Sequence, residues 1–269
     1  GDADFLPECL RGLSAQEHVS ADVHVISDGS RWPLLPAGVS HGAARFHYYE
    51  TPGGWGPYRI TNAVFPFLRS DLLAIQDADD ISLPQRLWRQ AATLQATGCE
   101  MISSAAWNFY HSPADRDSCR QTPAIVRPGR VTKSTPFGTC VNGTRMICRD
   151  TFERLNGFAD IPASGDYQFD GRAGGAGVHI YHDQTILLRR RLHIASNTNG
   201  PLRIGSNKRV ELNGVMRHDV DSMRLSPTLA NAQRLGALRD ATAGDGLVCL
   251  NNREAFTADS VDTLTTVGG

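Results

Sequence analysis

The pattern of apolar and polar positions predicts that strands and helices alternate along most of the chain. Apolar residues recur at helical spacing over residues 5–13, and they alternate with polar ones over 22–27, which predicts a strand ending at the turn sequence DGS. A second apolar run, LLAIQ at 72–76, leads directly into three aspartates within four residues. Such alternation is typical of a largely parallel sheet covered by helices on both faces, with ligands beyond the carboxyl ends of its strands.

The other predicted elements follow in the same order. They are a helix at 58–69 that Pro66 interrupts, a helix from a Ser82–Gln85 capping box to Gly98, a strand at 100–105, a short helix from Asp150 to Gly157 and a strand at 185–193. Two amphipathic helices and a weakly patterned tail follow. We therefore expect an α/β domain over residues 1–199 and a mainly helical extension packed on it over 200–269.

Composition excludes several classes of function. Lys and Arg total 27 against 28 for Asp and Glu, so no overall basic field would attract nucleic acid, and we predict no such partner. There is no long uninterrupted apolar segment of the kind that spans a membrane. The six cysteines are scattered without Cys-x-x-Cys spacing, which indicates isolated thiols in a reducing compartment and predicts a cytoplasmic location.

The aspartates after LLAIQ are the strongest chemical signal. Asp77, Asp79 and Asp80 could form a solvated turn that caps the next helix, but their place at the end of a buried strand favours a ligand site. A calcium-binding EF-hand loop is excluded, because Ser82 and Trp88 stand where that loop needs Gly and Glu. Carboxylates at positions i and i+2 suit Mg²⁺ or Mn²⁺, which takes further ligands from phosphate oxygens.

Nucleotide-binding loops of the common kinds are absent. No phosphate-cradling GxxxxGK[ST] sequence occurs in the chain. The glycine-rich run AGGAG at 173–177 does not follow a predicted strand, as a dinucleotide-binding fingerprint must. The classes of enzyme built on these two loops are therefore excluded.

Several segments resemble family 2 inverting glycosyltransferases. AIQDADDISLPQRL is similar to the Asp-x-Asp segment of that family. Further segments resemble other regions of the family in the family's own order, from residue 5 to about 197: FLPECLRGLSAQ…ADVHVISDGS, GPYRITN, RDTFERLNGFAD, GDYQFDGR and RLHIAS. The resemblance implies an α/β, GT-A-type nucleotide-diphospho-sugar transferase fold with a mostly parallel central sheet flanked by helices.

The resemblance also implies which residues would bind the donor. Asp79 would bind Mn²⁺ or Mg²⁺ directly, and His193 would complete the metal shell or touch the diphosphate. Asp77 would lie against the ribose or a metal-bound water. Asp28 would contact the base or ribose, and Arg59 would meet a phosphate.

A second set of implied roles concerns the acceptor side. Asp166 would be the general base that takes the proton from the acceptor hydroxyl, with Asp170 as its rival in the same segment. Arg172 is expected to brace that segment rather than perform chemistry. Trp55 and Trp107 could be platforms for sugar rings, but we expect both to pack in the core.

The chain departs from the family pattern at four points. It begins after the family's first strand, which supplies nucleotide contacts. Ser27 replaces the first Asp of Asp-Asp-Gly-Ser, Thr61 replaces the Arg of Ala-Arg-Asn, and Gly165 replaces the Glu that precedes the base. These departures leave the implied metal site and base in place.

The resulting expectation is a metal-dependent inverting glycosyltransferase of hexosyl or N-acetylhexosaminyl type. It would move a sugar from a nucleotide-diphosphate donor to a hydroxyl of a glycan or lipid-linked acceptor in polysaccharide biosynthesis. The alternative is a catalytically inactive sugar- or nucleotide-binding relative, or a structural domain of a larger polysaccharide synthase. A membrane surface at the inner face of the cell envelope and a larger synthase are both left open as partners.

Overall fold

The strands form two separate sheets. The computed structural model describes residues 4–29, 44–119, 121–128, 140–196, 206–239 and 248–249. The smaller sheet has the order β1-β2-β9, with β1 at Ala21–Asp28, β2 at Ala44–Thr51 and β9 at Val248–Cys249. The larger sheet has the order β3-β7-β5-β8-β4, at Leu72–Ala74, Met146–Cys148, Met101–Tyr110, Ile180–Leu192 and Ile81–Ser82, and β6 (Ile125–Val126) pairs with β5.

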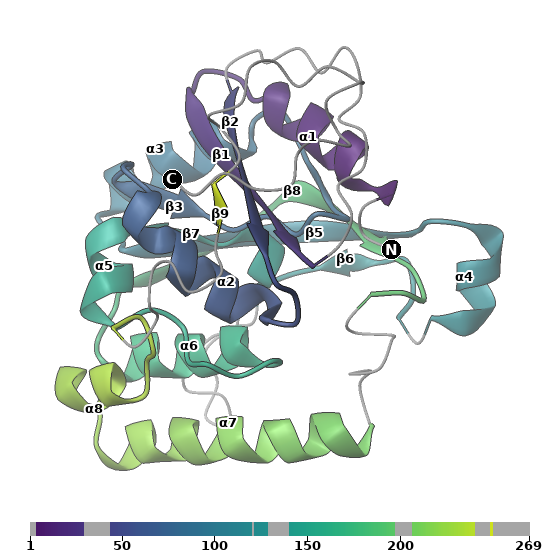
Figure 1. Cartoon of the computed structure of the whole chain (residues 1–269). Coiled ribbons are helices and arrows are strands. Elements are labelled where there is room, and N and C mark those ends of the chain that lie inside the picture. The colour runs from purple at the N-terminus through teal and green to yellow at the C-terminus, as the bar shows by residue number, and fades with distance from the viewer. Residues whose placement is uncertain are drawn as a thin grey trace.

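Pairing within these sheets is mixed. In the described part of the chain, the predicted parallel arrangement is found for β1 with β2 and for β5 with β8, the longest pair of the structure. The short strands β3, β4, β6, β7 and β9 all pair antiparallel to their neighbours. In Figure 1, β1 and β2 stand steeply against the larger sheet, which crosses the middle of the molecule.

Helices cover the sheets on several sides (Figure 1). α6 lies below the larger sheet, and α7 forms a further layer beneath α6. The helices are α1 (Leu6–Ser14), α2 (Gly56–Val64), α3 (Arg86–Thr97), α4 (Pro113–Ser118), α5 (Arg149–Arg154), α6 (Gly165–Gly175), α7 (Asn207–Leu225) and α8 (Leu229–Arg234), with 3₁₀ turns η2 at Phe65–Phe67 and η3 at Asn142–Thr144.

An aromatic cluster forms the centre of the main core. Phe152 packs against Phe65, Phe158 and Phe169, with ring centroids 5.1 to 5.8 Å apart. Strand residues close this cluster from the sheet side, and residues of α7 and α8 close it from below. Burial of these large apolar side chains favours the packing of α6 between the larger sheet and the helices α7 and α8.

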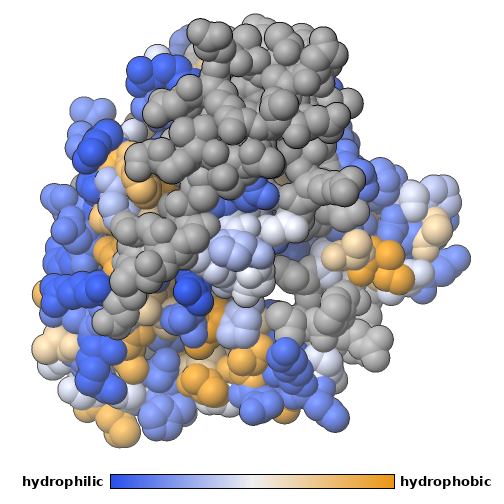
Figure 2. Space-filling view, viewed as in Figure 1, coloured by the Kyte–Doolittle hydropathy of each residue, from blue (hydrophilic) through white to orange (hydrophobic). Residues whose placement is uncertain are grey.

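The helices α7 and α8 pack on α6. The predicted division at residue 199 into a domain and an extension stays a prediction. Met216, Val220 and Met223 of α7 are buried, and a Cβ added to Gly171 of α6 would lie 2.7 Å from Val220. Figure 2 shows apolar side chains in the lower part of the view, over α6, α7 and α8. The predicted tail at 240–269 lies outside the described residues, apart from 248–249.

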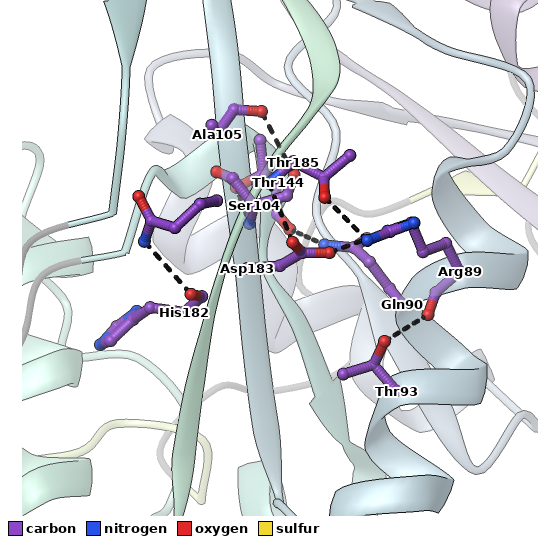
Figure 3. A network of polar contacts seen from close by, with 10 residues as sticks. Arg89, Gln90, Thr93, Ser104, Ala105, Thr144, His182, Asp183 and Thr185 are labelled. Atoms are coloured by element: carbon purple, nitrogen blue, oxygen red, sulfur yellow. Dashed lines mark hydrogen bonds and ion pairs between the residues drawn. The ribbon is translucent and has the colours of Figure 1, made fainter.

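A polar network attaches α3 to the larger sheet (Figure 3). Arg89 donates to Asp183 and Thr185 of β8 at 3.0 and 2.8 Å. At the next position of α3, the amide of Gln90 donates to the backbone oxygen of Thr144 at 2.6 Å. Thr144 in turn bonds both the N–H and the C=O of Ser104 in β5 at 3.0 Å. These contacts fix the helix that follows the aspartates.

Most predicted elements are present, with corrected boundaries. The helix expected at 58–69 is α2 followed by η2, since Pro66 cannot continue an α-helix. The predicted Ser82–Gln85 capping box is wrong: Ser82 donates to the side chain of Gln76 at 2.6 Å, and Gln85 is an N-cap without a side-chain bond. The helix that follows ends, as predicted, at Gly98 in the left-handed region, with φ 64°.

A cavity of about 490 Å³ separates the two sheets. His24 and Ile26 of β1 line one side, Leu72 and Leu73 of β3 line the other, and Val64 of α2 closes one end. In the described residues β1 bonds no strand but β2, and β3 bonds none but β7. The predicted absence of the family's first strand stays a prediction.

The longest described helix, α7, carries charged residues along much of its length. Among the described helices, none is both long and apolar enough to cross a membrane.

Candidate active site

Two residues predicted to bind a metal, Asp79 and His193, lie in contact. Asp79 follows β3 and His193 follows β8, and Oδ2 of Asp79 is 2.9 Å from Nε2 of His193. Arg191 at the end of β8 fixes this arrangement. Its backbone N–H donates to Oδ1 of Asp80 at 2.8 Å and its guanidinium donates to the backbone oxygen of Asp79 at 2.9 Å.

A buried guanidinium supports the acidic segment from beneath. Arg86 is fully buried and donates to the side chain of Gln76 and to the backbone oxygen of Ile75, both at 2.6 Å. Burial lowers the pKa of Arg86 to about 10, and the negative charges of Asp77 and Asp80 oppose that effect. Arg86 therefore stays charged at neutral pH and holds the turn that presents the aspartates.

Negative charge accumulates at this turn. Burial in the first place, and then the charge of Asp79, raise the pKa of Asp77 to about 6. The pKa of Asp80 is raised well above its ordinary value by burial and by both neighbouring aspartates, although Arg190 acts in the opposite direction. Carboxylates held together against their mutual repulsion form an environment that favours a bound cation.

Gly143 allows the backbone of η3 to approach this cluster closely. A Cβ added to Gly143 would lie 3.0 Å from Oδ2 of Asp77 and 3.2 Å from Oδ2 of Asp80. Any larger residue here would push the two carboxylates from their positions.

The residues present fit a divalent cation with two protein ligands. Within the described residues, no three His, Cys, Asp or Glu side chains are grouped as a complete protein-only metal site. The 2.9 Å between Asp79 and His193, however, is close to the ~3 Å expected between adjacent ligands of an octahedral ion with bonds of ~2.1 Å. Ions of this kind take their other ligands from water and from phosphate oxygens of the substrate.

Asp166, the predicted base, lies near the acidic turn. It occupies the first turn of α6, and its charge contributes to the raised pKa of Asp77. Oδ1 of Asp166 accepts a hydrogen bond from the hydroxyl of Tyr58 in α2 at 2.9 Å. The fold thus brings together three segments that are distant in the sequence: the turn after β3, the end of β8 and the start of α6.

Asp170 and Arg172, on the same helix, have structural contacts. Asp170 is buried and pairs with the fully buried Arg145 at 2.5 Å, while its other oxygen accepts from the N–H of Cys140 at 2.8 Å. Arg172 is also fully buried and donates to the backbone oxygens of Leu155, Ala232 and Gly157. The expectation that Arg172 braces the segment agrees with these contacts.

Asp28 lies at the end of β1, where it holds the start of α2. Its carboxylate accepts from the hydroxyl of Thr51 at 2.6 Å and from the backbone N–H groups of Trp55 and Gly56 at 3.1 and 2.9 Å. A carboxylate has about four acceptor positions, and the described residues fill three of those on Asp28. The predicted contact with base or ribose stays a prediction.

Arg59, Trp55 and Trp107 are not among the described residues that contact the acidic turn. Arg59 is exposed, and its guanidinium lies 4.6 Å from the ring centroid of Trp55. Trp107 on β5 is 44% exposed, so its expected place in the core is wrong. Within the described part of the chain, no contact joins Arg59 to Asp77, Asp79 or Asp80.

Comparison with known proteins decides the family. The model of the family described as "Glycosyl transferase family 2" matches residues 2–155, more than half of the chain. The chain belongs to glycosyl transferase family 2. EpsE of Bacillus subtilis (strain 168), a provisionally assigned glycosyltransferase, is 30% identical to this family 2 chain over 91 residues, which are 34% of the chain and 31% of EpsE.

Solved structures show the GT-A-type fold for this family 2 chain. S. aureus TarS 1–349 in complex with UDP-GlcNAc superposes with a TM-score of 0.58 at 12% identity, over 88% of the chain and 71% of TarS 1–349. The mannosyltransferase PcManGT from Pyrobaculum calidifontis, in complex with GDP-Man and Mn²⁺, gives 0.55 at 15% identity, over 89% of the chain and 68% of PcManGT. The chain spans about a third of the length of EpsE and of the longer TarS structure.

Three residues of this family 2 site were not found from the sequence. Tyr58 contacts Asp166, Arg145 pairs with Asp170, and Arg190 lies close enough to influence Asp77 and Asp80. Tyr58 falls inside the quoted segment GPYRITN, but sequence spacing carries no information about a partner on another helix. Arg190 stands in the run RRR of β8, where strand alternation could have placed it on one face.

Proposed function

We propose that the chain transfers a sugar from a nucleotide-diphosphate donor to a hydroxyl group with inversion at the anomeric carbon. The observation that carries this proposal is the convergence of the Asp79–His193 pair, Asp77 and Asp166, which come from three segments distant in the sequence. Family membership supports glycosyl transfer as the reaction class. We assign the Asp79–His193 pair to the donor side, where it would hold a cation. We assign Asp166 to the acceptor side, where it would accept a proton.

On the donor side, Asp79 and His193 would hold Mn²⁺ or Mg²⁺, and Asp77 would bind the ribose or a water of the ion. The ion, when bound, neutralises the diphosphate that leaves. Asp28 and Arg59 are proposed contacts for the base or ribose and for a phosphate. Mn²⁺ is present in the mannosyltransferase complex named above, which supports this choice of ion.

On the acceptor side, we assign the general base to Asp166. One carboxylate oxygen of Asp166 takes the proton of the acceptor hydroxyl while the hydroxyl oxygen attacks the anomeric carbon. The bond between that carbon and the diphosphate oxygen breaks on the opposite face. Asp170 is less suited to this role, because Arg145 and the N–H of Cys140 occupy its carboxylate inside the core. Asp166 is partly exposed, so an acceptor can reach it.

The acceptor is proposed to be a glycan or a lipid-linked glycan made in the cytoplasm. Residues 200–269 are proposed to be an extension of the transferase domain, since α7 and α8 pack on α6, the helix that carries Asp166. A membrane surface or a larger synthase remains a proposed partner. The rival function is a sugar-binding relative without activity.

A panel of nucleotide sugars tests the proposal. The protein is incubated with UDP-, GDP- and dTDP-linked hexoses and N-acetylhexosamines and Mn²⁺, with free sugars and lipid-linked glycans as acceptors, and nucleoside diphosphate and product are quantified. Asp166→Asn should abolish transfer but leave nucleotide binding intact, while Asp117→Asn, at an exposed carboxylate of α4, should change neither. Nucleotide binding by the wild type without any transfer would favour the inactive relative.

A further inference from the structure

We propose that Tyr58 is a positioning residue for Asp166, and that Gly165 is required to make room for it. This inference rests on the proposed function, since it concerns how the proposed base is held. The sequence assigned the role of general base to Asp166 alone. The inference adds Tyr58, from a second helix, as the residue that holds this base in position.

The contact between Tyr58 and Asp166 is a hydrogen bond between side chains of two different helices, α2 and α6. The hydroxyl of Tyr58 donates to Oδ1 of Asp166 at 2.9 Å. Tyr58 is 7% exposed, and its ring lies 5.2 Å from the ring of Phe158 in the main core. The hydroxyl therefore reaches Asp166 from a ring that cannot easily turn away. Oδ1 is held by this bond. Among the described residues no hydrogen bond to the other carboxylate oxygen is found, so the acceptor hydroxyl can approach that oxygen.

Gly165 lets the ring lie directly against the start of α6. A Cβ added at Gly165 would be 2.6 Å from Cδ2 and 2.8 Å from both Cε2 and Cγ of Tyr58. These separations are too short for any side chain at position 165 while the ring stays in place. The backbone of Gly165 is not in the left-handed region, so the glycine is required by this contact rather than by its φ angle.

The helix that carries Tyr58 is fixed at both ends. Asp28 accepts from the N–H groups of Trp55 and Gly56 at the start of α2. Near the other end, the side chain of Asn62 both donates to the C=O and accepts from the N–H of Phe158 at 2.9 Å. α2 thereby connects a proposed donor contact, Asp28, to the segment that leads into α6.

The hydroxyl remains a donor under all working conditions. Burial, and after it the charge of Asp166, raise the pKa of Tyr58 well above 10. Tyr58 is therefore protonated at neutral pH, as a hydrogen-bond donor to a carboxylate must be. A general base works best when its geometry is set before the acceptor arrives, because misplacement by ~1 Å costs up to about 10²-fold in rate.

Two variants with matched controls test the role. Tyr58→Phe removes the hydroxyl and keeps the ring; kcat for transfer should fall roughly 10- to 100-fold, with the donor KM and the Kd for UDP unchanged. Tyr49→Phe removes a hydroxyl that bonds His24 in the smaller sheet and should leave kcat unchanged. An unchanged kcat in Tyr58→Phe, or a rise in KM of the same size in place of the fall in kcat, would overturn the inference.

The glycine is tested in the same assay. Gly165→Ala should lower kcat at least as much as Tyr58→Phe, whereas Gly214→Ala, in a helix with open space around it, should not. In a Tyr58→Ala background the further effect of Gly165→Ala should be less than twofold, because the clash is gone. Full activity of Gly165→Ala would contradict the inference. Absence of transfer by the wild type with every donor would instead overturn the proposed function, and this inference with it.

Discussion

Nε2 of His193 lies 2.9 Å from Oδ2 of Asp79, although the two residues are 114 positions apart in the chain. The pairing of β8 with β4, the strand that follows the aspartates, brings the two segments together, and Arg191 joins them at two further points. The ring of Phe5, 4.7 Å from the ring of His193, covers the same place from the start of α1. The proposed metal ligands thus belong to a structure that is packed on several sides.

The buried ion pair behind the site yields a prediction about stability. Asp170→Asn should lower the free energy of unfolding by about 3–5 kcal/mol, since it leaves the fully buried guanidinium of Arg145 without its counter-charge. Urea denaturation followed by circular dichroism measures this. Asp183→Asn is the control: it removes the partner of Arg89, whose side chain is 45% exposed, and should cost about 1 kcal/mol or less. Equal losses for both variants would contradict the assignment of Asp170 to structure.

What could be predicted from the sequence follows from local signals. The apolar run before Asp77, the left-handed position at Gly98 and the periodicity of α1 depend on neighbours in the chain, and these predictions were confirmed. The capping box at Ser82 failed because a buried tertiary network, with Gln76 and Arg86, takes its hydroxyl. Tertiary partners compete with local ones wherever a polar side chain is buried.

The rest of the site could not be predicted because its contacts are between distant segments. The Tyr58–Asp166 bond joins residues 108 positions apart, and the Arg145–Asp170 pair joins the end of η3 to the middle of α6. α6 itself was not predicted as a helix: its glycines weaken the helical pattern, and most of its residues are buried, polar ones included, so no clear polar face marks the period. The resemblance located Asp166, but only the fold shows what holds it.

A change at Gly143 should affect ligand binding more than folding. Gly143→Ala places a methyl group 3.0 to 3.2 Å from carboxylate oxygens of Asp77 and Asp80, so these groups must shift by a few tenths of an ångström. We expect the affinity for UDP with Mn²⁺ to fall roughly tenfold, since the ligand geometry of small divalent ions is strict. Calorimetric titration measures the affinity, and a thermal melt within a few degrees of the wild type would show that the fold is kept. An unchanged affinity would place the ligand elsewhere.

The smaller sheet should make stability depend on pH. Burial, and then the neighbouring His47, lower the pKa of His24 from 6.5 to about 4. Between these pH values the unfolded chain binds a proton that the folded chain does not, so stability is lost as pH falls from 6.5 towards 4. His24 is only partly buried, so solvent screening reduces the loss, which should stay below the ~3.4 kcal/mol that a fall in pKa from 6.5 to about 4 would give at ~1.36 kcal/mol per unit.

His24→Gln should reduce this dependence. The free energy of unfolding is compared at pH 7.5 and 4.5 for both proteins, so that other titrating groups cancel. A smaller drop in the variant is expected. The same drop in both proteins would show that His24 titrates alike in the folded and unfolded chain.

The most direct test of the central claim is calorimetric titration of UDP into the protein with Mn²⁺ and with EDTA, beside Asp79→Ala and His193→Ala. If Asp79 and His193 hold the ion that holds the diphosphate, the wild type binds UDP in the presence of Mn²⁺ and at least tenfold more weakly in EDTA. Each variant should then bind UDP as weakly in the presence of Mn²⁺ as in EDTA. GDP and dTDP are titrated in the same way, so that the choice of base does not decide the outcome. Tight binding that is indifferent to Mn²⁺ and to both substitutions, or no binding of any of the three nucleotides, would contradict the account.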